Sequence, residues 1–177
     1  MANPLISIKK TIGIEGGYAH LAGDAGGRTM YGIAEKFWPQ YWRNGPPSYE
    51  TALLFYTNEF WHPLRLSGVE SQAVANEMLD SAVNIGKRRP VLWLQESLNL
   101  LRREYTHFGI PWEPLKVDGV MGAKTVLATN EYTSRSATHE RALFAALEGF
   151  QIYKYLYESQ PQFVRGHLAQ RTEQWDD

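Results

Sequence analysis

The chain has 177 residues, a formal net charge of −1 and no cysteine. This length suits one compact domain or a core with a small subdomain. The near-zero charge gives no general attraction to nucleic acid or anionic lipid, and the absence of thiols excludes disulfides and thiolate metal sites.

The chain offers no pattern for a metal or a cofactor. Its five histidines have no paired spacing typical of metal ligands. The glycine-rich segment 23–29 lacks the glycine and lysine positions of a phosphate-binding loop. We therefore expect no metal and no cofactor.

The N-terminus and the hydropathy pattern bear on where the protein acts. Residues 1–8 have no basic region and only a short apolar run, so we expect no signal peptide. No apolar run approaches the roughly 18 residues that suggest a membrane span. The expectation is a protein made in the cytoplasm, without a membrane span.

The first predicted element is a helix over residues 4–14. Its apolar stripe comprises Leu5, Ile8 and Ile12. Gly16 and Gly17 follow, and glycine readily adopts the left-handed conformation that ends a helix. Glu15 is therefore predicted to lie in the last helical turn.

A carboxylate at this position faces the negative end of the helix dipole. The dipole disfavours the charged form, so the pKa of Glu15 is expected to be raised. Glycoside hydrolysis requires such a protonated carboxylic acid as its general acid. The ordinary alternative for a glutamate near a helix end is a solvated surface group.

A tight β-hairpin is predicted after this helix. It comprises a strand over 18–21, a turn over 23–27 and a return strand over 28–33. Such a ribbon would hold Asp24 and Thr29 near Glu15. Because aspartate beside glycine is also a common turn former, Asp24 has a structural alternative.

Two short motifs lie within residues 15–33. They read Glu15-Gly16-Gly17-Tyr18 and Asp24-x-Gly26-Gly27-x-Thr29-x-Tyr31-Gly32-Ile33. Together they resemble the signature of glycoside hydrolase family 108, which contains phage endolysins and bacterial secretion-activator muramidases that cleave peptidoglycan. In that family the Glu of the Glu-Gly-Gly-Tyr motif is the catalytic acid, a role that the resemblance carries over to Glu15. The order of Glu15, Asp24 and Thr29 is also similar to that of phage-type lysozymes, with the threonine one residue earlier.

Two longer helices are predicted next, over residues 49–61 with Ser48 as N-cap and over 70–85 with Gly86 at its end. Asp80 and Asn84 lie one turn apart on the second helix. They either form hydrogen bonds inside the fold that brace the hairpin, or they line a glycan groove. Residues 79–86 also resemble the family's second motif.

The basic run 87–89 before Pro90 marks a predicted boundary between a catalytic part, 1–88, and a helical C-terminal subdomain, 89–177. Its helices are predicted over 91–108, 122–132, 139–159 and from residue 161. Residues 117–125 resemble the Asp-Gly-x-x-Gly-x-x-Thr turn of peptidoglycan-binding modules. In that turn Asp118 is expected to bond its own backbone.

The sequence thus predicts a mainly α-helical, lysozyme-like fold with one small β-hairpin and a helical C-terminal subdomain packed on the catalytic part. The resemblance implies an endolysin-like N-acetylmuramidase, an antimicrobial, bacteriolytic enzyme that cleaves the β-1,4 bond between N-acetylmuramic acid and N-acetylglucosamine. The predicted catalytic residues are Glu15, Asp24 and Thr29, and the predicted substrate-binding residues are Tyr18, Tyr31, Asp80 and Asn84. The alternatives are a lytic transglycosylase that acts on the same bond and a non-catalytic peptidoglycan-binding or secretion protein.

The expected partner is bacterial cell-wall peptidoglycan, in the periplasm or the cell wall. A protein without a signal peptide reaches this substrate only after a holin or another release system frees it. We expect a monomer that binds no nucleic acid.

Overall fold

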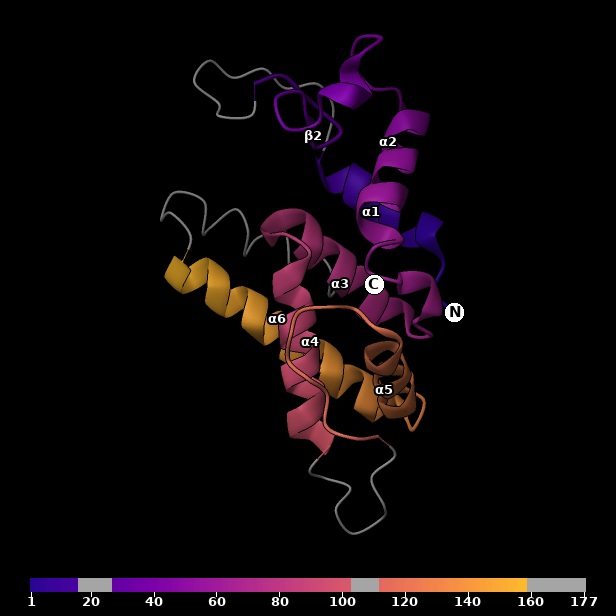
Figure 1. The fold of residues 1–177 in the computed structure, drawn as a ribbon, viewed down its shortest axis with the longest axis vertical. Coiled ribbons are helices and arrows are strands. Elements are labelled where there is room, and N and C mark those ends of the chain that lie inside the picture. The colour runs from indigo at the N-terminus through magenta and orange to yellow at the C-terminus, as the bar shows by residue number, and fades with distance from the viewer. Residues whose placement is uncertain (16–26, 103–111, 159–177) are drawn as a thin grey trace.

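The computed structural model describes residues 1–15, 27–102 and 112–158. Over these residues the fold is mainly α-helical with one two-stranded hairpin, which confirms the predicted class (Figure 1). The elements are α1 (Pro4–Glu15), β1 (Thr29–Met30), β2 (Ile33–Ala34), the 3₁₀ helix η1 (Pro39–Trp42), α2 (Tyr49–Tyr56), the π-helix η2 (Thr57–Trp61), the 3₁₀ helix η3 (Leu66–Gly68), α3 (Gln72–Ile85), α4 (Arg88–Leu101), α5 (Ala123–Thr133) and α6 (Ala137–Glu158). Within these ranges no helix combines the length and the apolar character needed to cross a bilayer.

Helix α1 begins at an asparagine–proline pair. The Asn3 Oδ1 atom accepts a hydrogen bond from the Leu5 backbone N–H at 3.0 Å, as an N-cap does. Pro4 suits the first helical position, where its missing N–H would have no helical partner. The helix ends at Glu15, which confirms that this residue lies in the last turn.

The face of α1 that packs on α3 is partly polar. Ile8 and Ile12 of the predicted stripe are buried, but Leu5 is 49% exposed. The inner face instead includes Ser7, whose hydroxyl donates to Asn76 Oδ1 at 2.6 Å and accepts from Gln72 Nε2 at 2.9 Å. The prediction for Leu5 is wrong because these hydrogen bonds to α3 turn the helix so that Ser7 faces inward.

The hairpin, Thr29–Ala34, overlaps the segment 28–33 that was predicted to be a single return strand. Strands β1 and β2 are antiparallel, with Thr29 opposite Ala34 and Met30 opposite Ile33. Between them Tyr31 and Gly32 have φ angles of 51° and 74°, which suit a two-residue turn of the primed type. The prediction of a continuous strand over 28–33 is therefore wrong, because the chain reverses at Tyr31-Gly32. The predicted strand over 18–21 and most of the predicted turn over 23–27 lie outside the described residues.

The longer helices have polar N-caps, of which Ser48 was predicted, whereas Ser71 was not and α3 begins two residues later than predicted. Ser48 accepts from the Thr51 N–H at 3.2 Å at the start of α2, and Ser71 accepts from the Val74 N–H at 3.1 Å at the start of α3. Gly86 ends α3 with a φ of 85°, a value that glycine adopts without strain. The predicted helix over 49–61 is confirmed, except that its last five residues form the π-helix η2.

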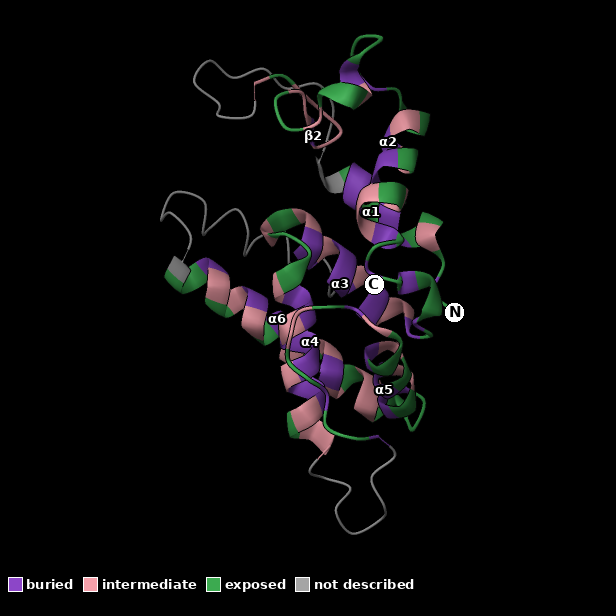
Figure 2. Cartoon of the chain, in the orientation of Figure 1, coloured by how far each residue is buried: buried purple, intermediate pink, exposed green. Residues whose placement is uncertain are grey.

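One hydrophobic core joins the N-terminal and C-terminal helices. Buried residues line the facing sides of the helices (Figure 2). Met78 and Leu79 of α3 belong to the same buried cluster as Leu94 and Leu98 of α4. Helix α6 packs on both α3 and α4, and α5 packs on α4 and α6 (Figure 1). The division into 1–88 and 89–177 stays a prediction, and the two parts share a core.

Candidate functional site

Helix α1 packs on α2 (Figure 1). The last turn of α1 carries no basic residue that would offset the negative end of its dipole. The side chain of Glu15 and residues 16–26, which include Tyr18 and Asp24, lie outside what the structure describes. The roles of these three residues therefore stay predictions.

Tyr31 stands at the tip of the hairpin in a conformation that is uncommon for a residue with a side chain. Its φ is 51°. Its main-chain oxygen accepts a hydrogen bond from the buried Tyr56 hydroxyl at 2.8 Å, and its ring meets the Tyr49 ring edge to face with centroids 6.0 Å apart. Two aromatic residues of α2 therefore hold this strained turn in place.

The base of the hairpin is closed by a charge pair beside Thr29. Arg28 donates to both carboxylate oxygens of Glu35, at 2.7 and 2.5 Å. The guanidinium also lies 5.3 Å from the ring centroid of Trp42, and the Trp42 indole N–H donates to the Ile33 carbonyl at 3.1 Å. Thr29, half-buried on β1, is thus placed on a braced ribbon.

Sequence reasoning missed this bracing. Arg28 and Glu35 are seven positions apart, too far for neighbouring contact within one helix or one strand. The two residues meet only because the chain reverses at Tyr31-Gly32. That dipeptide, between Met30 and Ile33, was the signal that could have found them.

A second unpredicted carboxylate, Glu59, lies on η2, an element that contacts both α1 and α3. Its Oε1 atom accepts a hydrogen bond from the Tyr41 hydroxyl at 2.9 Å. Burial, followed by the hydrogen bond and the negative charge of Glu59, raises the pKa of Tyr41 to about 12. The Glu59 carbonyl also accepts from Lys87 Nζ at 2.8 Å. Because π-helical turns are frequent at functional sites, Glu59 is a further candidate for this region.

Asp80 and Asn84 are brought together on α3. The Asn84 amide donates to the Asp80 carbonyl at 2.9 Å and to its Oδ1 atom at 3.3 Å. The Asp80 Oδ2 atom accepts from Gln151 of α6 at 3.2 Å. Asp80 and Asn84 are therefore hydrogen-bonded to each other within α3, and Asp80 also connects α3 to α6. Bracing of the hairpin and contact with glycan stay predictions.

Polar side chains also fill the interface between α3 and α6 behind Asp80. The Ser81 hydroxyl lies 3.1 Å from Glu77 Oε1 and 3.0 Å from Gln151 Oε1. The Gln151 amide donates to the Tyr155 hydroxyl at 2.7 Å. Because Glu77 and Gln151 are buried, these bonds fix the rotation of α6 against α3.

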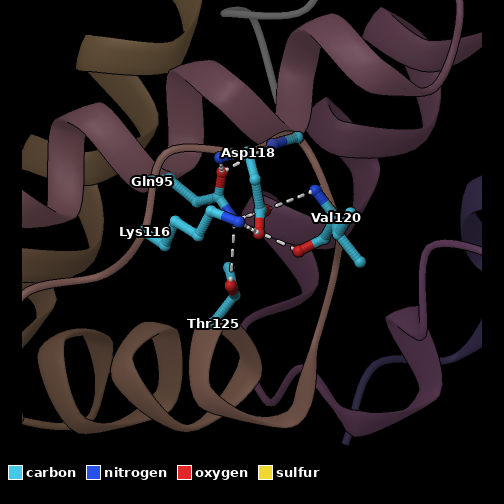
Figure 3. A network of polar contacts seen from close by, with 6 residues as sticks. Gln95, Lys116, Asp118, Val120 and Thr125 are labelled. Carbon is cyan, nitrogen blue, oxygen red and sulfur yellow. Dashed lines mark hydrogen bonds and ion pairs between the residues drawn. The ribbon is translucent and has the colours of Figure 1, made fainter.

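The Asp-Gly turn is organised by one glutamine (Figure 3). The Gln95 amide of α4 lies within 3.1–3.3 Å of Asp118 Oδ1, the Val120 carbonyl and Thr125 Oγ1. Its Oε1 atom accepts from the backbone N–H groups of Asp118 and Gly119 at 3.0 and 2.9 Å. No local pattern connects Gln95 with this turn, because the two are more than twenty residues apart in the chain.

The Asp118 carboxylate accepts from the Val120 backbone N–H at 2.9 Å, which confirms that it bonds its own turn. This bond, then the Gln95 amide and the nearby Lys116 charge, hold the pKa of Asp118 below its usual value. Gly119 has a φ of 74°, and a Cβ there would lie 2.6 Å from Arg88 Cγ. These contacts give the turn an architectural role.

Residues 8–86 match the family model described as Glycosyl hydrolase 108. This segment belongs to that glycosyl hydrolase family. It holds all the predicted catalytic and substrate-binding residues, and the match supports a glycoside hydrolase. The C-terminal resemblance to peptidoglycan-binding modules lies outside the match and stays a prediction. No curated protein sequence matches the chain.

The fold is similar to that of SagA from Brucella abortus. The similarity covers 96% of this chain and 88% of that chain, with a TM-score of 0.63 and 20% sequence identity. At this identity the likeness concerns the fold. With the helices and the hairpin, it confirms the predicted lysozyme-like fold over nearly the whole chain.

Proposed function

We propose that the protein is a peptidoglycan hydrolase, an N-acetylmuramidase that cleaves the β-1,4 bond between N-acetylmuramic acid and N-acetylglucosamine. The observation that carries this proposal is the position of Glu15, the last residue of α1, inside the segment that matches Glycosyl hydrolase 108. The family match supports cleavage of a glycosidic bond. Peptidoglycan as the substrate follows from the resemblance of the two motifs in residues 15–33.

Glu15 would protonate the leaving glycosidic oxygen. At the end of a helix whose last turn has no cation, the negative end of the dipole favours the neutral acid. That environment supports a carboxyl group that still carries its proton at the pH of catalysis.

Asp24 and Thr29 would serve the other face of the bond. A second carboxylate can orient the attacking water or stabilise the oxocarbenium-like transition state. The Thr29 hydroxyl, which both donates and accepts hydrogen bonds, would help to hold that water. The braced hairpin supports a fixed position for Thr29, because the Arg28–Glu35 pair and Trp42 close the ribbon beside it.

Tyr31 is proposed to contact a sugar ring. Its turn is held by Tyr56 and its ring by Tyr49, so a ligand would meet a fixed aromatic surface with little loss of side-chain entropy. Tyr18, Asp80 and Asn84 complete the proposed substrate-binding set. The substrate would lie in the periplasm or the cell wall, reached through a holin or another release system.

The test of this function is mass spectrometry of the fragments released from purified sacculi. Hydrolysis adds water and leaves a reducing N-acetylmuramic acid end, which is the expected product. A 1,6-anhydro end would assign the protein to the lytic transglycosylases instead. Binding of sacculi without released fragments would identify a non-catalytic wall-binding protein.

A further inference from the structure

A pocket of about 450 Å³ lies between the segment 62–68, which belongs to the glycosyl hydrolase match, and α5, which lies beyond that match. One wall is polar and comes from the turn before η3 and from η3 itself. The other wall is one face of α5, formed at positions i, i+3, i+4 and i+7 by Ala123, Val126, Leu127 and Asn130. The volume is in the range of small-molecule sites. We call this cavity the η3–α5 pocket.

The polar wall carries two basic side chains at the ends of one turn. The Arg65 backbone N–H donates to the His62 carbonyl at 2.9 Å, which closes the turn and keeps both residues on the same edge of the pocket. Both residues are exposed, and neither side chain has a hydrogen-bond or ion-pair partner among the residues that the structure describes. The described lining contains no acidic residue. An anion in the pocket would therefore meet no repulsion from its walls.

Arg65 occupies this position in a left-handed backbone conformation. Its φ and ψ are 50° and 32°, values that are uncommon for a residue with a side chain and that glycine adopts at lower cost. Local strain of this kind is concentrated at binding and active sites. An arginine in place of a glycine at this turn therefore favours a role for its guanidinium group.

Ser67 supplies a third donor on the same wall. Its Oγ atom accepts a hydrogen bond from the indole N–H of the buried Trp61 at 2.8 Å, which fixes the oxygen against the core. That bond uses the oxygen as an acceptor, and the O–H has no acceptor within the described ranges. The Arg65 fork, a ring N–H of His62 and this O–H thus bring donors from three residues to one small cavity.

The two walls are held at a fixed separation. The Asn130 side chain donates to the Gly68 carbonyl at 2.8 Å and accepts from the Glu70 backbone N–H at 2.9 Å. A Cβ at Gly68 would lie 3.1 Å from Val126 Cγ1, so the glycine permits the close approach of η3 to α5. Because the pocket is preformed, a ligand would lose little free energy in ordering its walls.

We propose that the η3–α5 pocket binds a phosphate monoester that carries an apolar substituent. Donors from three separate residues match the three terminal oxygens of a phosphate, whereas a carboxylate has two oxygens and is satisfied by one arginine fork. Val126 and the 56% exposed Leu127 offer an apolar wall to the substituent. A ligand in this pocket would contact both the hydrolase segment and α5, and would stabilise the folded protein by binding across them.

The probe is phenyl phosphate, titrated into the full chain by calorimetry in a buffer without phosphate. Saturable binding is expected, about tenfold tighter than that of inorganic phosphate, because the phenyl ring buries apolar surface on the α5 wall. Leu127→Ala should remove most of that advantage and leave the affinity for inorganic phosphate unchanged. Alanine suits the helix, so this variant should fold.

Arg65→Asn tests the contact with the anion. Asparagine tolerates the left-handed conformation, so the denaturation midpoint should be kept, whereas the affinity for both phosphates should fall about tenfold or more. Arg141→Gln removes another exposed positive charge, on α6 outside the pocket, and is the matched control. Equal weakening by the two variants would indicate diffuse attraction by charge and would overturn the proposal, as would the absence of saturable binding to the unaltered protein.

Two sources of the phosphate are separated by sedimentation with phosphatidylcholine vesicles that contain or lack phosphatidic acid. Sedimentation that requires both phosphatidic acid and Arg65 would identify a lipid headgroup, whereas binding of phenyl phosphate alone would identify a soluble ester. Either result supports the pocket. Neither measurement involves cleavage, so a failure here would leave the proposed hydrolase function intact, and a protein without lytic activity would still be expected to bind the ester.

Discussion

The Tyr56 hydroxyl donates a hydrogen bond to the main-chain oxygen of Tyr31 at 2.8 Å. Tyr56 is fully buried on α2, whereas Tyr31 occupies the positive-φ turn of the hairpin. One core side chain therefore links the hydrophobic core to the ribbon that carries Thr29. Because the ribbon belongs to the proposed site, a change in the core at this position is expected to reach catalysis.

Replacement of Tyr56 by phenylalanine tests this link. Tyr56→Phe keeps the ring and removes the hydroxyl, so the free energy of unfolding should fall by about 1 kcal/mol in urea denaturation. Turnover on sacculi should fall as well, because the hairpin tip loses its support. Tyr49→Phe is the control, since its hydroxyl has no hydrogen-bond partner among the described residues. Equal stability and activity of Tyr56→Phe and the unaltered protein would contradict the link.

The Gln95 network predicts a strong dependence of the C-terminal part on one side chain. Gln95→Glu preserves shape but replaces the amide donor with a charged acceptor next to Asp118. The free energy of unfolding is expected to fall by about 2–3 kcal/mol, because buried acceptors lose their donor. The exposed Gln40→Glu should change it by less than about 0.5 kcal/mol. Similar denaturation midpoints for the two variants would rule out this role of Gln95.

Asp118 predicts a pH dependence of stability. Its pKa is lowered in the folded protein, so the ionised carboxylate stabilises the fold at neutral pH. That contribution should be lost as the pH falls below about 4, towards the lowered folded pKa. Asp118→Asn cannot titrate and is the reference. The difference in unfolding free energy between the two proteins should shrink on acidification, and a difference that stays constant with pH would contradict the prediction.

The sequence was sufficient to predict helix ends, because these depend on a few neighbouring residues. Glu15 could be placed at a helix end because two glycines follow it, and Ser48 and Gly86 mark a helix start and a helix end for equally local reasons. The hairpin was misplaced because the glycine-rich segment before it was the stronger turn signal. Tyrosine seldom takes a positive φ, so Tyr31-Gly32 gave a weak signal.

Contacts between distant segments could not be predicted. Gln95 reaches the Asp-Gly turn, and Ser81 meets Gln151 from a position 70 residues away. Such pairs depend on the rotation and register of packed helices, which a single sequence does not specify. Glu59 was missed for the same reason, because its partner Tyr41 comes from another element.

Asp24 is predicted to act through its charge. Asp24→Asn keeps the size and the turn-forming ability of the side chain but removes the carboxylate. Turnover should drop while binding to sacculi stays nearly unchanged, because the lost interaction belongs to the transition state. Normal turnover of the folded variant would reduce Asp24 to a structural part of its turn and leave Glu15 as the principal catalytic group.

The most direct test of the proposed function is the rate at which Glu15→Gln releases fragments from purified sacculi, compared with the unaltered protein. Glutamine matches the shape of the acid and cannot donate its proton to the glycosidic oxygen. Circular dichroism and the denaturation midpoint should be unchanged, and the rate should fall by about 100-fold or more. A correctly folded Glu15→Gln protein that still released fragments at a comparable rate would contradict the assignment of Glu15 as the general acid.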